Sequence, residues 1–576
     1  MDLAGLASAG SSLSRASGVV VLVLVCVWPV CSHAQSPSTD HLQIEKAKEL
    51  LGAERWQEIV DLVESNPHPP AELYFYYGTA LARLERWDDA RRAFHAGARL
   101  EPFDKRFPLE LAGVAFKQKR YPEAAGHLRH ALELAPDDSY ANDFLATVYL
   151  LLRNPEAALK YWNRIGKPQV AGIEMEPPPK VDSVLLDHAF AFSPADLLRL
   201  PDLLTSEARI RSLGTFSSFR FELLARSDGK FDVLFRNHER GGWGSSKLEA
   251  LFSLFRSLPA ETVNPEFFNL GHRAINLVSL YRWDAQKRRV NVRLSGPLGR
   301  QARRRYTVGG DWRNENWIIR TSFTGPDTEL GSFNLRRTAV AGGLFSVVTG
   351  RWNWSAGAEL SHREFRNVVP GIALTPSLLA EGFQLKQIMR VNADVWRIPE
   401  RRVVLSADGS SESGRIWSDP THSFLKLQGA LRFHWFPRAE GDDYEMQHRV
   451  SIGRTVGDVP FDELFVLGVL GDNPLLMRGH VTTRGGRKGS GPIGRNYFIS
   501  NWDLEKNVLR KYGATLSIGP FIDIGKITDD SPVLGSQKWL VDTGIQVRVR
   551  VFGASILLSY GKDLRSGNNA VTARLE

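Results

Sequence analysis

The chain changes its pattern of apolar and polar positions along its length. A continuous apolar run covers Val19 to Val30, helical spacing dominates from about residue 42 to 166, and period-two alternation takes over from about Phe267 to Glu576. Apolar residues three and four apart predict helices, whereas alternation predicts strands with one apolar and one polar face. We therefore expect a multidomain α+β protein, with an N-terminal α-solenoid and a C-terminal antiparallel sheet.

The alternation is clearest in two segments, 424–435 and 544–552. In each of them aliphatic or aromatic side chains share one face, and charged or amide side chains share the other: Leu425, Leu427, Leu431, Phe433 and Trp435 against Lys426, Gln428, Arg432 and His434; Ile545, Val547, Val549 and Val551 against Gln546, Arg548 and Arg550. A soluble β-sandwich is the alternative, but inward arginines could not be buried unpaired in a dry core. The pattern favours a transmembrane β-barrel with a lipid-facing exterior and a wet lumen.

The size of this region sets the strand number. Residues 267–576 at roughly 19 residues per strand and loop predict about sixteen strands. A mean hydropathy of −0.23 is compatible with this, because barrel strands average lipid-facing and lumen-facing residues. The chain has no apolar run of the roughly 18 to 20 residues that a membrane-spanning helix needs, which argues against a helical membrane protein.

The apolar run at the N-terminus predicts a secretory signal peptide over residues 1–34. Arg15 precedes the run, and Ser32 and Ala34 suit cleavage before Gln35. A membrane anchor is the alternative, although twelve apolar residues are too short to span. Both cysteines, Cys26 and Cys31, lie in this segment, so the mature chain is expected to have neither a disulfide framework nor a thiolate metal site.

The helical part, residues 35–170, repeats itself every 34 residues. Small residues, aromatic residues and prolines recur at that period: Gly78, Ala112 and Ala146; Trp87, Tyr121 and Pro155; Ala90, Ala124 and Ala158; Phe94, Leu128 and Trp162; Pro102 and Pro136. This resembles tetratricopeptide (TPR) repeats, two well formed and the flanking ones degenerate. The resemblance implies a docking module for a periplasmic or membrane partner, with Tyr74, Tyr76 and Tyr77 as candidate surface contacts.

A short domain is expected between the solenoid and the barrel. Prolines at 177–179 predict a stiff linker over residues 171–180. Residues 181–240 then predict a strand at Val181–Leu186, a helix from Ser193-Pro194 through Arg211, and strands at Phe219–Ala225 and Phe231–Arg236. This βαββ order resembles a POTRA domain, whose sheet edge can accept a client strand; a rigid spacer is the alternative. Residues 241–266 are a connecting segment.

Two motifs in the barrel region carry sharper information. Pro460 to Phe465 leads through a Gly-rich stretch to Met477-Arg478-Gly479-His480, and Phe521-Ile522-Asp523-Ile524-Gly525 follows on a strand whose alternation points Asp523 into the lumen. These motifs resemble the POTRA-bearing barrels of the BamA/TamA and two-partner-secretion superfamily, the bacterial surface antigen type. The resemblance implies a loop folded into the lumen, with its Arg478 held by Asp523 and by a second carboxylate, Asp503 or Glu505.

The resemblance has further implications and two departures. His480 stands where the family commonly has an aromatic residue, and Met477 where a β-branched residue is usual. The segment Phe267–His272 resembles the entry to the first barrel strand, which implies that Ile275–Tyr281 and the last strand, Ala570–Glu576, border a lateral gate. The chain ends without the terminal aromatic residue common in outer-membrane barrels.

By this resemblance the chain is expected in the bacterial outer membrane, with its N-terminal domains in the periplasm, where it would assemble or translocate client outer-membrane or secreted proteins. The alternative is a polysaccharide-export porin with a TPR docking domain. No Walker loop, His-Glu-x-x-His or Gly-x-Ser-x-Gly motif occurs, so no enzyme, metal or cofactor is predicted. The net charge of +9 suits the phosphates of outer-membrane lipids, and nucleic acid is not an expected partner of a secreted chain.

Overall fold

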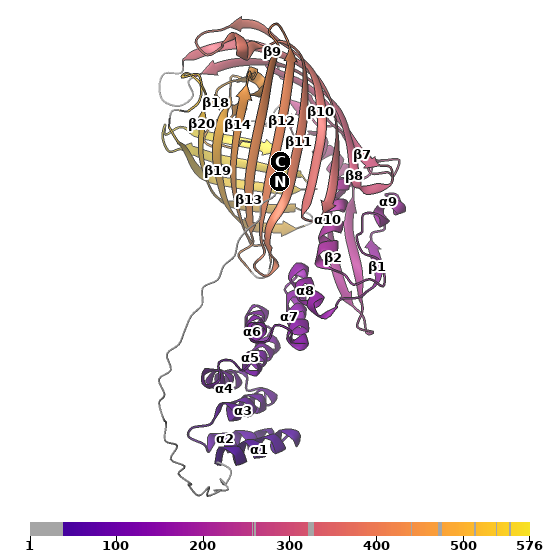
Figure 1. Ribbon diagram of the computed structural model, residues 1–576, viewed down its shortest axis with the longest axis vertical. Helices are drawn as coiled ribbons and strands as arrows, with labels where there is room; N and C mark the ends of the chain where they lie inside the picture. Colours follow the sequence, from indigo (N-terminus) through magenta and orange to yellow (C-terminus); the bar gives the residue numbers. More distant parts are fainter. Residues whose placement is uncertain are drawn as a thin grey trace, which may run out of the picture. The chain divides into compact units, whose positions relative to one another are not determined.

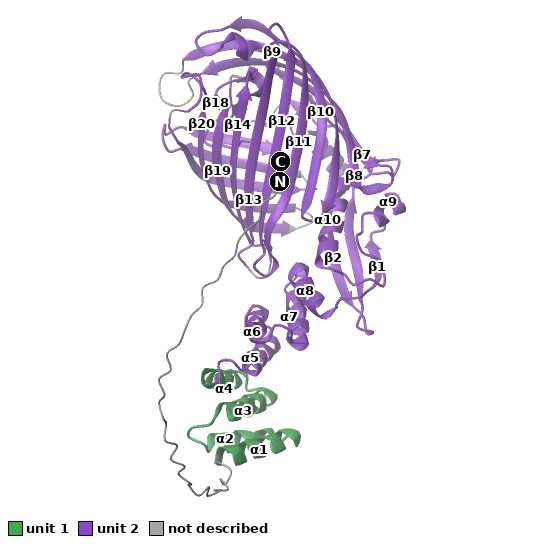
Figure 2. Ribbon diagram, in the orientation of Figure 1, with its two compact units in different colours: residues 1–100 green, residues 101–576 purple. Residues whose placement is uncertain are grey.

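The computed structural model describes residues 39–255, 257–258, 261–320, 328–438, 441–469, 475–511, 514–536, 538–551 and 554–575 (Figure 1). The predicted signal peptide lies outside them. The chain forms two compact units, residues 1–100 and 101–576 (Figure 2). None of the described helices is long and apolar enough to cross a membrane.

The first unit contains the helices α1 (Thr39–Gly52), α2 (Trp56–Glu64), α3 (Ala71–Arg83) and α4 (Trp87–Leu100). The recurring small residue at 78 has a direct steric reason: a Cβ added to Gly78 would come within 2.5 Å of the ring of Phe94 on α4. Phe94 is fully buried. A glycine on α3 therefore lets the aromatic residue 16 positions later fill the space between the two helices.

The second unit begins with four more helices, α5 (Arg106–Lys117), α6 (Tyr121–Leu134), α7 (Ser139–Leu151) and α8 (Pro155–Trp162). They repeat the same register, since the recurring positions Ala112, Ala146, Leu128 and Trp162 are all buried. Two helices begin at a capping side chain: Asp138 accepts a hydrogen bond from Ala141 N, and Asn154 accepts one from Ala157 N. The prediction of a TPR-like solenoid is confirmed.

A small α/β domain follows, with β1 (Val170–Glu176), α9 (Ser183–Asp187), α10 (Leu200–Leu213), β2 (Phe216–Ala225) and β3 (Phe231–Glu239). Its three-stranded sheet has the order β1-β3-β2, with β1 parallel and β2 antiparallel to the central strand β3. Gly214 ends α10 in the left-handed conformation (φ +66°) that glycine adopts without strain.

The first strand of this domain was predicted at the wrong place. Val181–Leu186 is not a strand, because Asp182 caps the short helix α9 there by accepting a hydrogen bond from Leu185 N. The strand that pairs with β3 is β1, which occupies more than half of the predicted linker; only the prolines after Glu176 interrupt it. The element order βαββ survives with a shifted first strand and an additional short helix.

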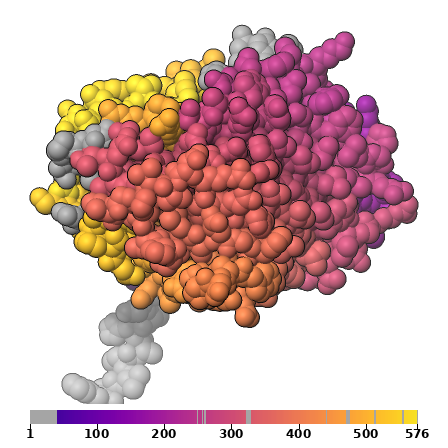
Figure 3. All heavy atoms as spheres, turned by 90° about the horizontal axis from the view of Figure 1, so that it is seen from above, coloured from indigo at the N-terminus to yellow at the C-terminus, as the bar shows by residue number. Residues whose placement is uncertain are grey.

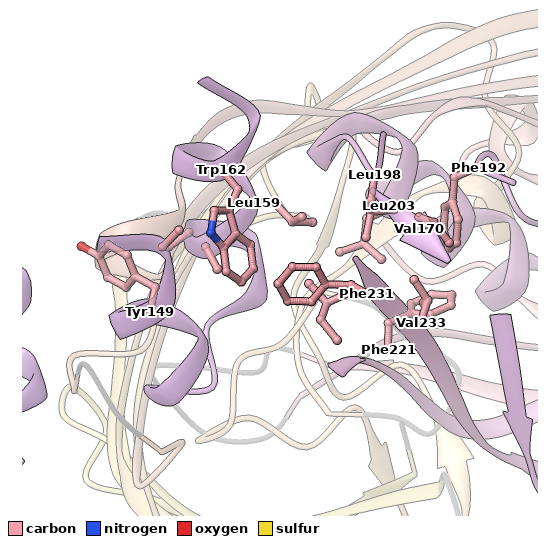
Figure 4. Packing of buried hydrophobic residues seen from close by; sticks show 14 of the residues in the cluster. Tyr149, Leu159, Trp162, Val170, Phe192, Leu198, Leu203, Phe221, Phe231 and Val233 are labelled. Carbon is pink, nitrogen blue, oxygen red and sulfur yellow. The ribbon is translucent and has the colours of Figure 1, made fainter. Parts of the chain in front are cut away.

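One hydrophobic core joins the last TPR helices to this domain (Figure 4). The ring of Trp162 on α8 lies 4.9 Å from that of Phe231 on β3, and Val170, Leu203 and Val233 complete the contact. The domain also packs on the barrel. Gly350, in the turn between two barrel strands, lies so close to α10 that an added Cβ would come within 2.3 Å of the Leu204 backbone.

The connecting segment and the start of the barrel are irregular. They contain α11 (Lys247–Phe255), β4 (Thr262–Val263) and β5 (Glu266–Leu270). Both short strands pair antiparallel with β6 (Ile275–Arg282), so they form one interrupted strand beside it. The segment Phe267–His272, predicted as the entry to the first barrel strand, therefore begins within β5 and ends in the turn that follows it.

The remaining long strands are β7 (Lys287–Leu298), β8 (Gln301–Arg320), β9 (Glu329–Thr349), β10 (Trp352–Val369), β11 (Gly382–Ile398), β12 (Val403–Trp417), β13 (His422–Trp435), β14 (Tyr444–Gly457), β19 (Asn496–Lys511), β20 (Ala514–Thr528), β21 (Leu540–Val551), β22 (Ala554–Asp563) and β23 (Asn569–Leu575). Successive strands pair antiparallel, and the sheet order returns from β23 to β4, which is the order of a barrel. The chain colours run round the face in Figure 3 from magenta through orange to yellow.

Among the described residues, fifteen strands surround the barrel when β4 and β5 count as one. The predicted barrel of about sixteen strands is thus confirmed. The two faces differ as the alternation indicated: Val340, Leu427, Ile452 and Ile545 are exposed, whereas lumen-side residues such as Arg363 and Asp523 are fully buried. At the end that carries the α/β domain, β7–β8 and β9–β10 are joined by two-residue turns, whereas 370–381 and 458–495 are long connections at the other end.

Candidate functional site: a loop fixed inside the barrel

The longest connection, residues 458–495 between β14 and β19, folds back into the lumen. It contains a short hairpin of β16 (Thr483–Arg484) and β17 (Arg487–Lys488), and it pairs with itself through β15 (Phe465–Val466) and β18 (Ile493–Gly494). Lys488 pairs with Trp317 of β8, one of the early strands of the barrel, and its ammonium lies 2.8 Å from Glu315, which is 173 residues away in the sequence. The loop therefore reaches across to the wall formed by the early strands.

Arg478 lies at the tip of this loop and is 1% exposed. Its Nε and its backbone N–H both donate to Asp523 Oδ2 at 2.9 Å, and a terminal nitrogen donates to Oδ1 of the same carboxylate. The guanidinium also donates to Asp503 and Gln546, and it stacks 3.8 Å from the ring centre of Phe521. A two-pronged Arg–carboxylate contact of this kind fixes orientation as well as position.

The structure decides between the two acidic residues of β19. Asp503 accepts a hydrogen bond from Arg478, whereas Glu505 accepts from Gln546 at 2.7 Å and from Arg548 at 2.8 Å. Glu505 therefore belongs to the barrel wall beside the tip and does not contact Arg478 directly.

The wall opposite the tip carries a row of three aspartates. Asp523 on β20 lies directly opposite Asp542 on β21, which in turn lies opposite Asp563 on β22. All three are buried, and like charges at directly opposite positions destabilise a sheet unless they are neutralised. The loop supplies two basic side chains to this row, Arg478 and His480.

His480 is the second of these side chains. Its Nδ1 lies 2.9 Å from Asp542 Oδ2, and its Nε2 lies 3.6 Å from Asp563 Oδ2. Histidine at this position can therefore bridge two carboxylates. Within the described part of the chain, these three residues also form a group whose ligand atoms lie within 4.8 Å of one another, close enough to hold a metal ion.

Three glycines permit this close approach. A Cβ on Gly479 would come within 2.6 Å of the Asp542 carboxyl carbon, and one on Gly525 would come within 2.8 Å of Met477 Sδ. On β22, a Cβ on Gly561 would come within 2.3 Å of the Arg478 carbonyl oxygen. The tip thus fits against the wall only because side chains are missing at these positions.

A second anchor of the loop was not predicted. Glu463, 5% exposed, lies 3.0 Å from the ammonium of Lys386 and 3.5 Å from the guanidinium of Arg337, while Asp462 lies 3.4 Å from Arg363. These cations come from three neighbouring strands, β9, β10 and β11. The signal in the sequence was the Asp-Glu pair ahead of the Arg-Gly motif, but its partners lie on other strands, and Lys386, for example, is 77 residues away.

An aromatic cluster supports the second anchor. The ring of Phe461 lies 5.5 Å from that of Trp317 and 5.1 Å from that of Phe333.

Of the three tyrosines predicted as surface contacts in the first unit, one differs from expectation. Tyr76 is buried and donates to Glu72, which makes it a core residue, whereas Tyr74 and Tyr77 are partly exposed.

Comparison with known proteins gives structural likeness only. No protein-family model matches the chain, and no curated protein sequence does. Among solved structures, BamA from Haemophilus ducreyi lacking POTRA domains 1-3 is 11% identical, with a TM-score of 0.39 over 70% of this chain and 83% of that one. CdiB from Escherichia coli is 14% identical, with a TM-score of 0.45 over 71% of this chain and 76% of that one.

The helical part resembles other structures. YrrB, described as a TPR protein with an unusual peptide-binding site, is 18% identical, with a TM-score of 0.20 over 22% of this chain and 66% of that one.

Proposed function

We propose that the chain is an outer-membrane protein that inserts, assembles or translocates client proteins, with its TPR solenoid and its POTRA-like domain in the periplasm. The observation that carries the proposal is the loop 458–495, fixed inside the barrel by Arg478 on Asp523 and Asp503. The motifs on both sides of this contact are those through which the sequence resembles assembly and translocation barrels.

Placement in a membrane is supported by the outer face of the barrel. Exposed aliphatic and aromatic side chains recur on successive strands, including Val308, Val340, Leu360, Phe383, Leu427, Ile452, Ile522 and Ile545. A soluble protein would not leave so continuous an apolar surface in contact with water. In outer-membrane barrels the short turns face the periplasm, and here that end carries the α/β domain.

Client capture is supported by the α/β domain. Because β3 is central, β1 and β2 are both edge strands of a three-stranded sheet. An edge strand can pair with an extended segment of another chain through backbone hydrogen bonds, which need no particular client sequence. The helices α5 to α8, joined to this domain by one core, would hold a partner or a client next to the barrel entrance.

The experiment is assembly in liposomes. The full chain is reconstituted, and a urea-unfolded outer-membrane barrel protein is added as client; folding is followed by the gel shift of the folded form. Faster client folding than in empty liposomes is expected. The variant Asp523→Asn should lose this acceleration. Asp530→Asn, at an exposed aspartate that does not contact Arg478, should keep it. If the unaltered chain does not accelerate client folding but binds an acidic polysaccharide in a parallel pull-down, the polysaccharide exporter would be supported instead.

A further inference from the structure

A large cavity occupies the lumen at the end of the barrel that carries the α/β domain. Its volume is about 1010 Å³, and it is bordered by α8, α10 and the loop tip. Nine arginines line it against four carboxylates: Arg153, Arg211, Arg397, Arg402, Arg432, Arg449, Arg478, Arg548 and Arg574 against Glu156, Glu207, Asp394 and Asp503. The cavity therefore carries an excess of positive charge.

Several of these arginines are neutralised by carboxylates. Arg397 contacts Glu156 at 2.8 Å, Arg432 contacts Asp408, and Arg548 contacts Glu505. Arg449 on β14 and Arg574 on β23 differ from them. Within the described residues neither guanidinium makes a hydrogen bond or an ion pair, although the Nε atom of each is buried. Among the described residues, the charged groups near Arg574 are Arg449, Arg478 and Arg548. Those near Arg449 are Arg432 and Asp408, and the Asp408 carboxylate already contacts Arg432.

A second cavity of about 710 Å³ continues this surface on the other side of the loop tip. Asn353, Asn392, Arg432 and Arg449 line both cavities. The second cavity adds four cations, Arg313, Arg390, Lys426 and Lys488, and four carboxylates, Glu315, Asp408, Glu412 and Asp462. Lys488 is paired with Glu315 and Arg390 with Glu412, so Arg432 and Arg449 keep a small excess of positive charge there. Cationic side chains therefore border the lumen on both sides of Arg432 and Arg449.

Partly buried cations without counter-charges destabilise a protein and attract anions. Guanidinium groups fit carboxylates in a two-pronged geometry. We propose that the lumen binds an extended acidic segment of a client polypeptide, whose carboxylates pair with Arg449 and Arg574. The assignment to a polypeptide rests on the proposed function, whereas the assignment to a carboxylate-bearing chain rests on the cavity alone.

The experiment measures binding of a labelled ten-residue glutamate peptide to the full chain in detergent micelles, by fluorescence anisotropy. The glutamate peptide should bind and the matched glutamine peptide should not, and added salt should weaken the binding because it screens the charges. The double variant Arg449→Gln/Arg574→Gln should bind at least about tenfold more weakly, because the loss of even one charge-assisted hydrogen bond lowers affinity by about that factor. Arg226→Gln, on the exposed β2–β3 hairpin, is the matched control and should change nothing.

Two further arms keep the outcomes distinct. The variant Arg449→Lys/Arg574→Lys retains the charges and should retain most of the binding, which separates lost charge from lost folding. An oligogalacturonate of similar charge that binds while the glutamate peptide does not would overturn the polypeptide assignment. Equal binding by the glutamine double variant and the unaltered chain would overturn the site itself. Because this assay needs no client folding, its failure is separate from failure in the liposome assay.

Discussion

At the scale of single residues, the barrel wall and the loop tip are complementary in charge. The period-two alternation was enough to predict that Asp523 faces the lumen, and the motif was enough to pair it with Arg478 by resemblance. Neither the alternation nor the motif could distinguish Asp503 from Glu505 as the partner of Arg478, because residues two apart on a strand share a face. Nor could they find Asp542 and Asp563, since the row of aspartates arises only from the register of β20, β21 and β22.

Removing Arg478 should therefore leave buried carboxylates unpaired. We expect Arg478→Ala to lower the stability of the folded barrel by about 3 to 5 kcal/mol, the range for breaking one partner of a buried ion pair. The loop should then become sensitive to protease added from outside. Thermal unfolding and limited proteolysis measure the two effects. Asp530→Asn is the control, and equal stability of the Arg478→Ala variant and the control would contradict this account.

A glycine at the tip should be equally necessary. Gly479→Ala adds a Cβ that would lie within 2.6 Å of the Asp542 carboxyl carbon, so the tip must shift away from β21. We expect a loss of about 1 to 3 kcal/mol, as for other overpacked interiors. Gly126→Ala in α6, where a Cβ meets nothing within 4 Å, should instead be neutral or stabilising by up to about 1 kcal/mol. Melting temperatures of both variants provide the comparison.

At the scale of elements, the last TPR helix is attached to the barrel as well as to the α/β domain. Asn154 caps α8 and donates from Nδ2 to the carbonyl oxygen of Pro399 at 2.8 Å. Glu400 in the same turn contacts Lys160 and Tyr161, and the ammonium of Lys160 lowers the pKa of Glu400 despite its partial burial. This attachment could not be predicted from sequence patterns, because the turn lies about 240 residues after the helix.

The two roles of Asn154 can be separated by substitution. Asn154→Asp keeps the oxygen that accepts from Ala157 N but loses the donor to Pro399, whereas Asn154→Ala loses both. Each lost interaction is expected to weaken its own element by about 1 kcal/mol. Hydrogen exchange should show faster exchange at the start of α8 in Asn154→Ala only. Equal exchange there in both variants would contradict the capping role.

The same junction contains a group that titrates near neutral pH. Burial and the neighbouring Glu156 raise the pKa of Glu207 on α10 to about 7. The folded chain thus holds this proton more tightly than the unfolded chain. The unfavourable ionisation of Glu207 is absent below pH 4.5, grows as the pH rises to about 7, and is then constant.

Glu207→Gln should remove this penalty. Its stability relative to the unaltered chain should be unchanged at pH 4.5 and higher by up to about 3 kcal/mol at pH 8. Thermal unfolding of the full chain across this pH range measures the difference, and Glu133→Gln on an exposed site of α6 is the control. A stability gain that is the same at both pH values would show that Glu207 does not titrate in this window.

At the scale of the whole molecule, sequence patterns that extend over a few tens of residues were enough to predict the solenoid, the α/β domain and the barrel. The period of 34, the βαββ order and the alternating strands each reflect contacts within a few tens of residues. The shifted strand β1 shows the limit: Val170–Glu176 is short and precedes three prolines, so only its pairing with β3 identifies it. The second loop anchor at Glu463 shows the same limit, because its cations come from four separate strands.

The central claim is that the loop tip rests against β20 inside the barrel. The chain's two cysteines, Cys26 and Cys31, lie in the predicted signal peptide, so introduced cysteines can be followed without interference in the mature protein. The most direct measurement is oxidation of the double variant Met477→Cys/Gly525→Cys in intact outer membranes, in which the first substitution removes the Sδ that a Cβ at residue 525 would meet. The single variant Met477→Cys is the control. The account predicts that both thiols become protected from a maleimide reagent until a reductant is added. Full labelling of the oxidised double variant would contradict it.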